Sequence, residues 1–403
     1  IYRRNARVGD VMSNFTDFIS GGGDAAPIPT AQYVIGQSKT WTSPVTGRIK
    51  VILTGGGGQG AFLANVNGTV PFNYGDATGG GAGGYCAKTF NVTAGETFVV
   101  TIGAGGATAL APNSVTTSRI GNSAGNSSFV TGTAAESVNM VANGGGGGQY
   151  SASTTSIVTT AGGTGGTASG GDVNYTGGAG GTISRAVGNQ YNCATTGGGA
   201  VSLYGTAFHG GDITMTVFFS SASKYMASGG AGVGGHGADI LVDDTSNYAY
   251  LSQGGSATRD GPTTEVAHGT TVLTEVTLGG PYTGPTINVI DAQGSGGSSR
   301  FSPSGSIYGG GGGLGGGGGS GMGYISNTSS YYAGGLGGAF GGGGSVVAVG
   351  TSLYTSSNPI RAGLGGNGGG GSGAFSGPYA TATSASGRQW APGGDGICII
   401  MVV

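Results

Sequence analysis

The sequence carries very little charge for its length. Its 403 residues include 14 Lys and Arg and 16 Asp and Glu, so charged residues make up 7% and the formal net charge is −2. Binding to nucleic acid or to an anionic membrane surface requires clustered basic residues, and 14 Lys and Arg in 403 residues are too few to form such a basic patch. The composition therefore excludes nucleic acid as a partner, and long-range electrostatic steering is not expected.

Long apolar runs are also missing. No segment approaches the 18 or so consecutive apolar residues that cross a bilayer, so the sequence predicts no membrane insertion. Arg3, Arg4 and Arg7 precede no hydrophobic signal core. The chain begins at Ile1 rather than at Met, which leaves open that further sequence precedes it.

Cysteine is rare, and its spacing fits no metal site. Cys86, Cys193 and Cys398 lie far apart in the sequence, and three cysteines cannot all pair with one another. We expect all three to be small buried hydrophobic residues. The sequence predicts no cofactor.

Catalytic and metal-binding residues are equally sparse. His209, His236 and His268 stand in separate segments, so a triad or a metal site would require the fold to bring them together. Asp243 and Asp244 are adjacent carboxylates, which are more typical of a solvated turn, although calcium binding stays open. We therefore expect no catalytic residues, no metal and no enzymatic activity.

Glycine, by contrast, is abundant, with 98 residues against 12 prolines. In several glycine runs the other residues recur with a period of three, which fits neither an α-helix nor a β-strand. It fits an extended helix of the polyproline II type, with three residues per turn and about 3.1 Å rise. The period is carried by Ala333, Leu336, Ala339 and Ser345; Arg361, Leu364 and Asn367; Val233 and His236; Ala161, Thr164 and Thr167; and Thr176, Ala179 and Thr182.

Helices of this kind make no internal hydrogen bonds, so each must bond to neighbouring helices. Glycine is needed wherever a Cβ would hold two backbones apart, and the non-glycine residues must face solvent or a covering layer. We expect runs 309–319, 333–345 and 361–371 to lie side by side, with the first most central because its interruptions come only every six residues. The glycines singled out are Gly310, Gly315, Gly334, Gly337, Gly365 and Gly368.

Isolated glycine helices are not stable, so a scaffold must hold them in register. Alternating apolar stretches predict this scaffold in residues 38–143 and 394–403, with a bundle of glycine helices and inserted loops in residues 144–393. Residues 93–96 read as the turn of a hairpin, and the apolar C-terminal strand is expected in the middle of the same sheet. The predicted strands are residues 41–54, 83–92, 97–102, 126–130, 138–142 and 395–403.

Residues 1–37 are predicted to be an attachment segment and linker, broken at 21–29 by glycine and proline. Attachment to another protein and a terminus packed on the surface both stay open. Farther along, residues 270–278 alternate and are expected to pair with residues 248–251. Residues 214–219 are a further strand candidate.

The order of these elements resembles a known family. Trp41-Thr-Ser-Pro44, the strand 49–52 entering Gly55, the turn 93–98, and Gly396-Ile-Cys-Ile-Ile are similar to the glycine-rich domain of bacteriophage tail fibre and tail-tip adhesin proteins. The resemblance spans residues 38–403. A similar module occurs in the ligand-binding part of some animal receptor tyrosine kinases, so the fold alone does not fix the function.

Long excursions that are poor in glycine interrupt the glycine runs, and loops of this length in a compact domain tend to be functional. They are rich in aromatic side chains, which are common anchors of binding surfaces. Covering the bundle is the simpler role for any one of them. The receptor- or partner-binding candidates are Tyr191, Tyr204, Phe208, Phe218, Phe219, Tyr225, Tyr248, Tyr250, Tyr282, Tyr331, Tyr332, Tyr354, Tyr379 and Trp390.

The predicted fold class is mainly β and irregular, with a β-scaffold, a polyglycine II helix bundle, long distal loops and essentially no α-helix. The resemblance implies a non-enzymatic phage adhesin in the virion tail or outside the cell. Its partners would be a host surface receptor, either polysaccharide or outer-membrane protein, and another tail or virion protein bound through residues 1–37. The alternative is a structural subunit of a viral or extracellular fibre, and a homo-oligomer is left open.

Overall fold

The computed structural model contains strands and extended runs, and its described residues include no helix. Accordingly, no helix in the described part of the chain could span a membrane. The mainly β and irregular fold class is confirmed. The described residues are 31–64, 75–107, 120–151, 158–185, 191–200, 208–216, 224–232, 236–242, 249–252, 265–268, 276–278, 299–302, 307–308, 321–325, 332–333, 337, 341–350, 360–361, 363, 365–366, 368–376, 388–389 and 392–403.

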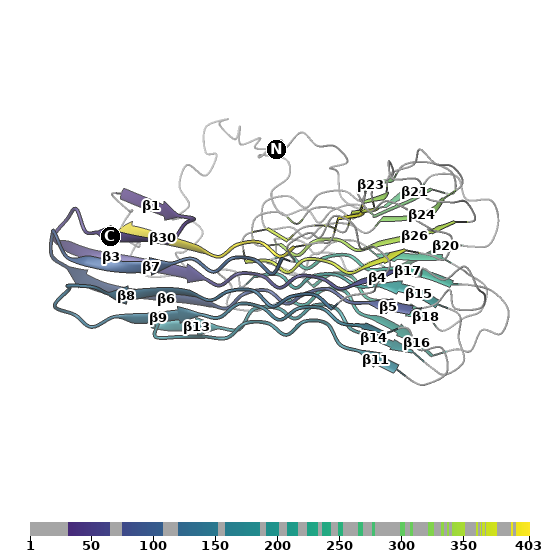
Figure 1. Ribbon diagram of the computed structural model, residues 1–403, viewed down its shortest axis with the longest axis horizontal. Helices are drawn as coiled ribbons and strands as arrows, with labels where there is room; N and C mark the ends of the chain where they lie inside the picture. Colours follow the sequence, from purple (N-terminus) through teal and green to yellow (C-terminus); the bar gives the residue numbers. More distant parts are fainter. Residues whose placement is uncertain are drawn as a thin grey trace, which may run out of the picture.

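One end of the molecule is a sandwich of two antiparallel sheets, at the left of Figure 1. The first proximal sheet has the order β1 (Ala31–Ile35), β30 (Ile397–Val402), β3 (Gly47–Thr54), β6 (Tyr85–Val92) and β13 (Val173–Tyr175). The second proximal sheet has the order β12 (Ala168–Ser169), β9 (Asn139–Ala142), β8 (Ser127–Thr131), β7 (Thr97–Thr101) and β2 (Lys39–Thr42). As predicted, β30 lies inside its sheet, between β1 and β3.

The sandwich encloses an apolar core because alternate residues of each strand face the opposite sheet. Leu53 and Ile400 from the first sheet meet Phe98 and Phe129 from the second, and all four are fully buried. The rings of Phe98 and Phe129 are stacked with centroids 4.9 Å apart. Cys86 and Cys398 are buried in this core and Cys193 in another, so the predicted burial of all three cysteines is confirmed.

The sandwich corrects three expectations. The predicted strands belong to two sheets, not one. The turn at residues 93–96 does not form a hairpin, because β6 pairs with β3 and β13, while β7 pairs with β2 and β8. This turn carries the chain across the sandwich, and the rings of Phe90 and Phe98 meet in the core 5.6 Å apart. Residues 31–35, placed in the linker, form β1 and pair with β30.

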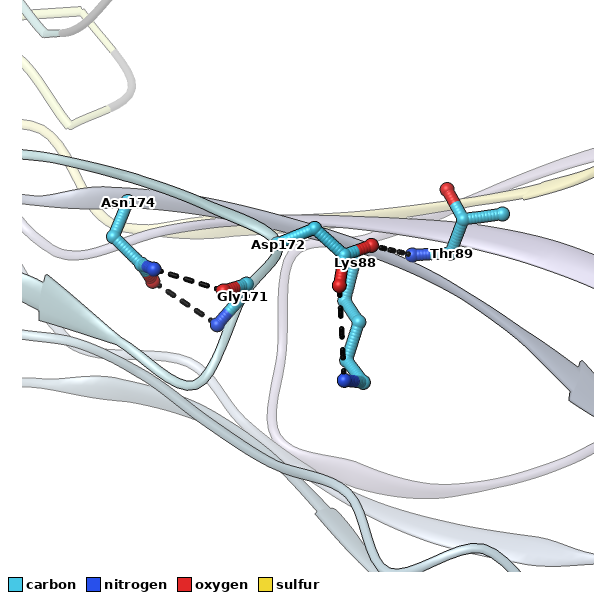
Figure 2. Close-up of polar contacts among 5 residues, drawn as sticks. All are labelled: Lys88, Thr89, Gly171, Asp172 and Asn174. Atoms are coloured by element: carbon cyan, nitrogen blue, oxygen red, sulfur yellow. Dashed lines mark hydrogen bonds and ion pairs between the residues drawn. The ribbon is translucent and has the colours of Figure 1, made fainter.

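A second crossing between the sheets joins β12 to β13 (Figure 2). Gly170 has a φ of 81°, which glycine adopts readily, and the Asn174 side chain both accepts from the Gly171 amide and donates to its carbonyl. Asp172 then accepts from the Thr89 amide at 2.8 Å and lies 3.8 Å from the Lys88 ammonium. These contacts attach the crossing to β6.

The glycine runs that leave the sandwich bond to one another with a three-residue period. Every third amide of residues 55–61 donates to residues 78–84, and the amides between them donate to residues 121–126 and 392–396. The donor–acceptor pairs are Gly55–Gly84, Gly56–Gly125, Gly57–Gly394, Gly58–Gly81, Gln59–Asn122 and Ala61–Thr78. The direction of bonding thus turns by one third of a circle per residue, which is the geometry of a polyglycine II helix.

Residues 78–84 lie inside the bundle and bond to six other runs. They donate to carbonyls in three of them and accept from amides in the other three, an arrangement of hexagonal packing. The six partners are residues 143–149, 368–371 and Gly178 as acceptors, and residues 55–61, 163–166 and Gly198 as donors. The bundle therefore extends beyond the expected 144–393, because the strands of the sandwich themselves continue as glycine runs. Run 309–319, expected at the centre, lies outside the described residues.

Glycine is required where these runs touch. A Cβ on Gly58 or Gly81 would come closer than 3.0 Å to the carbonyl oxygen of a neighbouring run, a separation that real Cβ atoms essentially never show. Thr164, Thr167 and Ala179 are exposed, as the three-residue period predicts. Ser345 departs from this pattern because it is fully buried and donates to the Ser228 carbonyl at 2.7 Å.

The other end of the molecule consists of four distal sheets, at the right of Figure 1. Most of their neighbouring strands are parallel. The first contains β11 (Val158–Thr160), β14 (Ile183–Arg185), β16 (Ile213–Met215) and β18 (Ile240–Val242). The second contains β10 (Tyr150–Ser151), β5 (Gly75–Ala77), β15 (Tyr191–Ala194), β17 (Lys224–Ala227), β19 (Ala249–Ser252) and β20 (Glu265–His268).

The third distal sheet lies against the second, and the fourth lies against the third. The third contains β21 (Val276–Leu278), β22 (Ser299–Ser302), β24 (Gly321–Ile325), β26 (Val346–Gly350), β28 (Ala374–Ser376) and β4 (Phe62–Ala64). The fourth contains β23 (Ile307–Tyr308), β25 (Tyr332–Ala333), β27 (Ile360–Arg361) and β29 (Arg388–Gln389).

Two pairings differ from expectation at this end. β19 pairs with β20 rather than with residues 270–278, and β21 pairs with β22. A strand nearer in sequence thus takes the position beside β19. Runs 333–345 and 361–371 are bonded as predicted, since the Gly366 amide donates to the Gly341 carbonyl.

The second of these runs is not continuous. Gly369 donates back to Gly366 and Gly368 has a φ of 71°, so a local turn interrupts it.

Candidate functional site

Three parallel glycine runs enter the first distal sheet through β14, β16 and β18. The strand register aligns Ile183, Ile213 and Ile240. In the preceding runs, the Gly210 amide donates to Ala179 and the Gly237 amide to His209, so the alignment continues back toward the bundle. Two rows of side chains result, one of Ala179, His209 and His236 and the other of Thr182, Asp212 and Asp239.

The two histidines of the first row are in contact. Their ring centroids are 3.9 Å apart, and the Phe208 ring lies edge-on to His236 at 4.9 Å. His236 Nδ1 accepts from the His209 amide at 3.1 Å, while His209 Nδ1 donates to the Gly210 carbonyl at 2.8 Å. Burial lowers the pKa of His236, the nearby His209 lowers it further, and Asp239 opposes this shift.

The two carboxylates of the second row each accept from a backbone amide. Asp212 Oδ1 accepts from Thr182 at 2.7 Å, and Asp239 Oδ1 accepts from Asp212 at 2.8 Å. Burial raises the pKa of Asp212, partly offset by the Thr182 hydrogen bond. A ring nitrogen of His209 and an oxygen of each carboxylate all lie within 4.8 Å of one another. Imidazole nitrogen and carboxylate oxygen are the ligands that first-row divalent ions accept.

A buried ion pair lies between the first two distal sheets. Arg185 Nε on β14 is 3.1 Å from Asp76 Oδ2 on β5, and the two side chains are 2% and 0% exposed. Thr160 on β11 donates to the same carboxylate oxygen at 3.1 Å. Burial raises the pKa of Asp76 to about 6, although the positive charge of Arg185 works in the opposite direction.

Buried hydroxyl groups mark the junction between the bundle and the distal sheets. Thr196 donates to Gly229, Ser228 donates to Gly211, and Ser345 donates to Ser228, each at 2.7 Å. These side chains satisfy backbone carbonyls at the point where the three-residue period gives way to the two-residue period of strands. These hydroxyl groups therefore have a structural role, which is to connect the bundle to the distal sheets.

Among the predicted aromatic candidates, Phe208 is described with its side chain and four tyrosines are described by backbone alone. Phe208 is half-buried against His236, whereas Tyr191, Tyr225, Tyr250 and Tyr332 are placed by backbone in β15, β17, β19 and β25. Of the singled-out glycines, Gly337, Gly365 and Gly368 are described. Outside the described residues lie Tyr204, Phe218, Phe219, Tyr248, Tyr282, Tyr331, Tyr354, Tyr379, Trp390, Gly310, Gly315, Gly334, Asp243 and Asp244.

The histidine–aspartate cluster was missed from sequence. The histidines were treated as unrelated, yet the structure brings His209 and His236 together. The available signal was a repeat: His209-Gly-Gly-Asp-Ile and His236-Gly-Ala-Asp-Ile share one pattern, and Ala179-Gly-Gly-Thr-Ile has the same spacing without His or Asp. A repeat in register places like residues side by side, so no coincidence of folding is required.

The described fold defines a class of protein in which an antiparallel sandwich holds a bundle of mutually hydrogen-bonded polyglycine helices. The chain matches the glycine-rich domain family over residues 31–255, more than half of its length, and it belongs to that family. The match begins at β1 and takes in the two rows of the first distal sheet. No curated protein matches the chain. The predicted glycine-rich domain is confirmed, and its phage tail context stays a prediction.

Proposed function

We propose that this protein is a non-enzymatic adhesin of a bacteriophage tail fibre or tail tip, which attaches to the host surface through its distal end. The arrangement of the excursions supports this proposal. Residues 186–190 connect β14 to β15, residues 216–223 connect β16 to β17, and residues 243–248 connect β18 to β19. All these strands lie at the end of the bundle away from the sandwich (Figure 1).

Aromatic residues lie at the starts of neighbouring strands in the second distal sheet. Tyr191, Tyr225 and Tyr250 occupy the first or second position of β15, β17 and β19, which are adjacent and parallel. Bundle helices in hexagonal contact form a stiff support, because the amides of residues 80–84 in the inner run all donate to other runs. A rigid support with aromatic, weakly charged loops suits a neutral polysaccharide or an outer-membrane protein as receptor.

A structural subunit of a fibre is the second candidate. β1 and β18 are edge strands of their sheets and carry exposed apolar residues, with Val34 60% and Leu241 45% exposed. Exposed apolar edge strands are potential contacts for another copy of the chain. In that case the distal loops would contact neighbouring subunits rather than a host surface.

Loop replacement tests the proposed function. We would exchange residues 351–359 and 377–387, which join β26 to β27 and β28 to β29, for Gly-Ser segments while keeping all four strands. Loop closure depends only weakly on length and composition, so both variants should fold. The measurement is attachment of the purified chain to a panel of bacterial strains that differ in surface polysaccharide and outer-membrane proteins.

Residues 108–119 provide the matched control, since they contain no aromatic residue and connect the runs that continue β7 and precede β8 of the sandwich. The proposal predicts attachment of wild type and of the control variant to some strains, and its loss in the distal variants. Unchanged attachment of the distal variants would overturn it. Absence of attachment combined with concentration-dependent self-association of wild type, measured by light scattering, would favour the structural subunit.

A further inference from the structure

We propose that His209, Asp212 and Asp239 form a binding site for a first-row divalent metal ion of the zinc class. One ring nitrogen and two carboxylate oxygens would hold the ion, with water completing its coordination shell. The site is independent of the proposed attachment role, because it rests on residues at the entrance to the first distal sheet rather than on the loops.

The three-residue period of the runs brings these ligands together. His209 and Asp212 are three residues apart in one run, so they face the same side of their helix. Asp239 occupies the position next to Asp212 in the neighbouring parallel run, as the pairing of Ile213 with Ile240 requires. The three potential ligand atoms lie within 4.8 Å of one another, so small side-chain rotations would bring them to a common ion.

Hydrogen bonds around the cluster hold the ligands in the form that a metal requires. His209 Nδ1 donates its proton to the Gly210 carbonyl, which leaves the lone pair of the neutral ring on Nε2. A backbone carbonyl in this role fixes ring orientation in many metal sites. Asp212 and Asp239 each engage a backbone amide through Oδ1, so Oδ2 of each carboxylate is the oxygen available to a cation.

His236 acts as a positioning residue in this site and is not a ligand. Its Nδ1 accepts from the His209 amide, so its own proton lies on Nε2 and no lone pair faces an ion. Its ring lies against that of His209, with centroids 3.9 Å apart, and the Phe208 ring lies edge-on to it at 4.9 Å. This neighbouring ring, tilted by 40° to that of His209, restricts the rotation of His209.

Capping of backbone amides is the simpler explanation of the two carboxylates. It accounts for Oδ1 of each aspartate and for His236, whose Nδ1 caps the His209 amide, but not for the His209 ring on the same face. The aligned run 176–182 has Ala179 and Thr182 at the equivalent positions and makes the same bonds between runs, since Gly210 donates to Ala179 and Ile213 donates to Thr182. The backbone bonds between runs therefore require neither His nor Asp at these positions, and a histidine beside two carboxylates from neighbouring runs indicates a ligand set.

The test is calorimetric titration of zinc chloride into the purified full chain after chelator treatment. We expect one zinc ion per chain for wild type. Asp239→Asn keeps an oxygen that accepts from the Asp212 amide but removes the charged ligand, and it should weaken zinc binding at least tenfold. His209→Gln should do the same. His236→Asn retains an acceptor for the His209 amide but removes the ring beside His209, so it should weaken zinc binding about tenfold, at the lower end of the effect of losing a group outside the coordination shell.

NMR of the histidine rings provides a second measurement of zinc binding, independent of calorimetry. The chain has only three histidines, so their ring resonances can be assigned, and zinc should shift those of His209 while leaving His268 unchanged. Melting curves without metal verify that each variant is folded. No zinc binding by folded wild type would overturn the proposal. Zinc binding that both ligand variants retain at wild-type affinity would overturn it as well, because the ion would then lie elsewhere.

Discussion

At the scale of single residues, the ion pair of Asp76 and Arg185 joins the first two distal sheets. Removing both charges from water costs several kcal/mol per ion, and their attraction offsets this only when geometry and hydrogen bonds are good. Thr160 supplies one such hydrogen bond, but Asp76 Oδ1 has no hydrogen-bond partner in the described structure. The pair is therefore better suited to fixing how the sheets meet than to adding stability.

This reasoning predicts different outcomes for single and double substitutions. Arg185→Met should lower the free energy of unfolding by about 3–5 kcal/mol at neutral pH, because the Asp76 carboxylate is then buried without its counter-charge. Replacing both residues with apolar ones, Asp76→Leu with Arg185→Met, should recover most of that loss. Denaturant titrations measure both. The Lys88–Asp172 pair is the exposed control, and Asp172→Asn should cost no more than about 1 kcal/mol.

Stability should also depend on pH through Asp76. Its pKa is about 6 in the folded protein and 3.8 ordinarily, so the folded state takes up this proton more readily than the unfolded state. Stability should then fall as pH rises from about 4 to about 6, by on the order of 1–3 kcal/mol. Unfolding of wild type and Asp76→Asn across this range isolates the effect, because the variant cannot titrate there. Parallel pH curves for the two proteins would contradict the assignment.

At the scale of one run, substitution should follow the three-residue period. Gly81 donates to Gly146 and accepts from Gly58, and a Cβ there would overlap the Thr164 carbonyl oxygen. Gly81→Ala should therefore cost about 1–3 kcal/mol through overpacking and lost hydrogen bonds. Thr164→Ala adds the same residue at an exposed position and should stay within about 0.5 kcal/mol. Equal losses in denaturant titrations would count against the period.

Elements with a strong local pattern could be predicted from sequence. The longer strands of the sandwich, such as β3, β6 and β7, span five to eight residues, which is enough for a strand pattern to be recognised. The spacing of residues such as Thr164 and Ala179 likewise indicates the three-residue period of the glycine runs. The distal strands are only two to five residues long in the sheets that hold β14, β25 and β26, so no period can be read from them. Their pairing is set by neighbouring glycine runs, which is information from the whole bundle and not from the local sequence.

The candidate site shows the same limit. Which residues of a run face outward could be read from the spacing of His236, but which other run lies beside it could not. That choice depends on the parallel register of β16 and β18. The crossing of the chain between β6 and β7 was misjudged for a related reason, because a tight turn can join two strands of one sheet or two sheets of a sandwich.

At the scale of the whole molecule, the sandwich, the bundle and the distal sheets form one continuous hydrogen-bonded structure (Figure 1). Chain segments leave the sandwich, cross the bundle, turn at the distal end and return. Neighbouring runs therefore point in both directions, and each gains its backbone partners from segments distant in sequence. Folding of any one run depends on the others, so cooperative loss of the bundle is expected on unfolding.

Residue-resolved amide hydrogen exchange tests this architecture most directly. In the inner run, Gly80, Gly81, Ala82, Gly83 and Gly84 all donate to other runs, so all five amides should exchange slowly. In the outer run, Gly163 and Gly166 donate to the inner run, whereas Thr164, Gly165 and Thr167 have no backbone acceptor among the described residues. The account predicts slow exchange at every third amide there. Protection at alternate amides, as in an edge strand, or none in either run would contradict it.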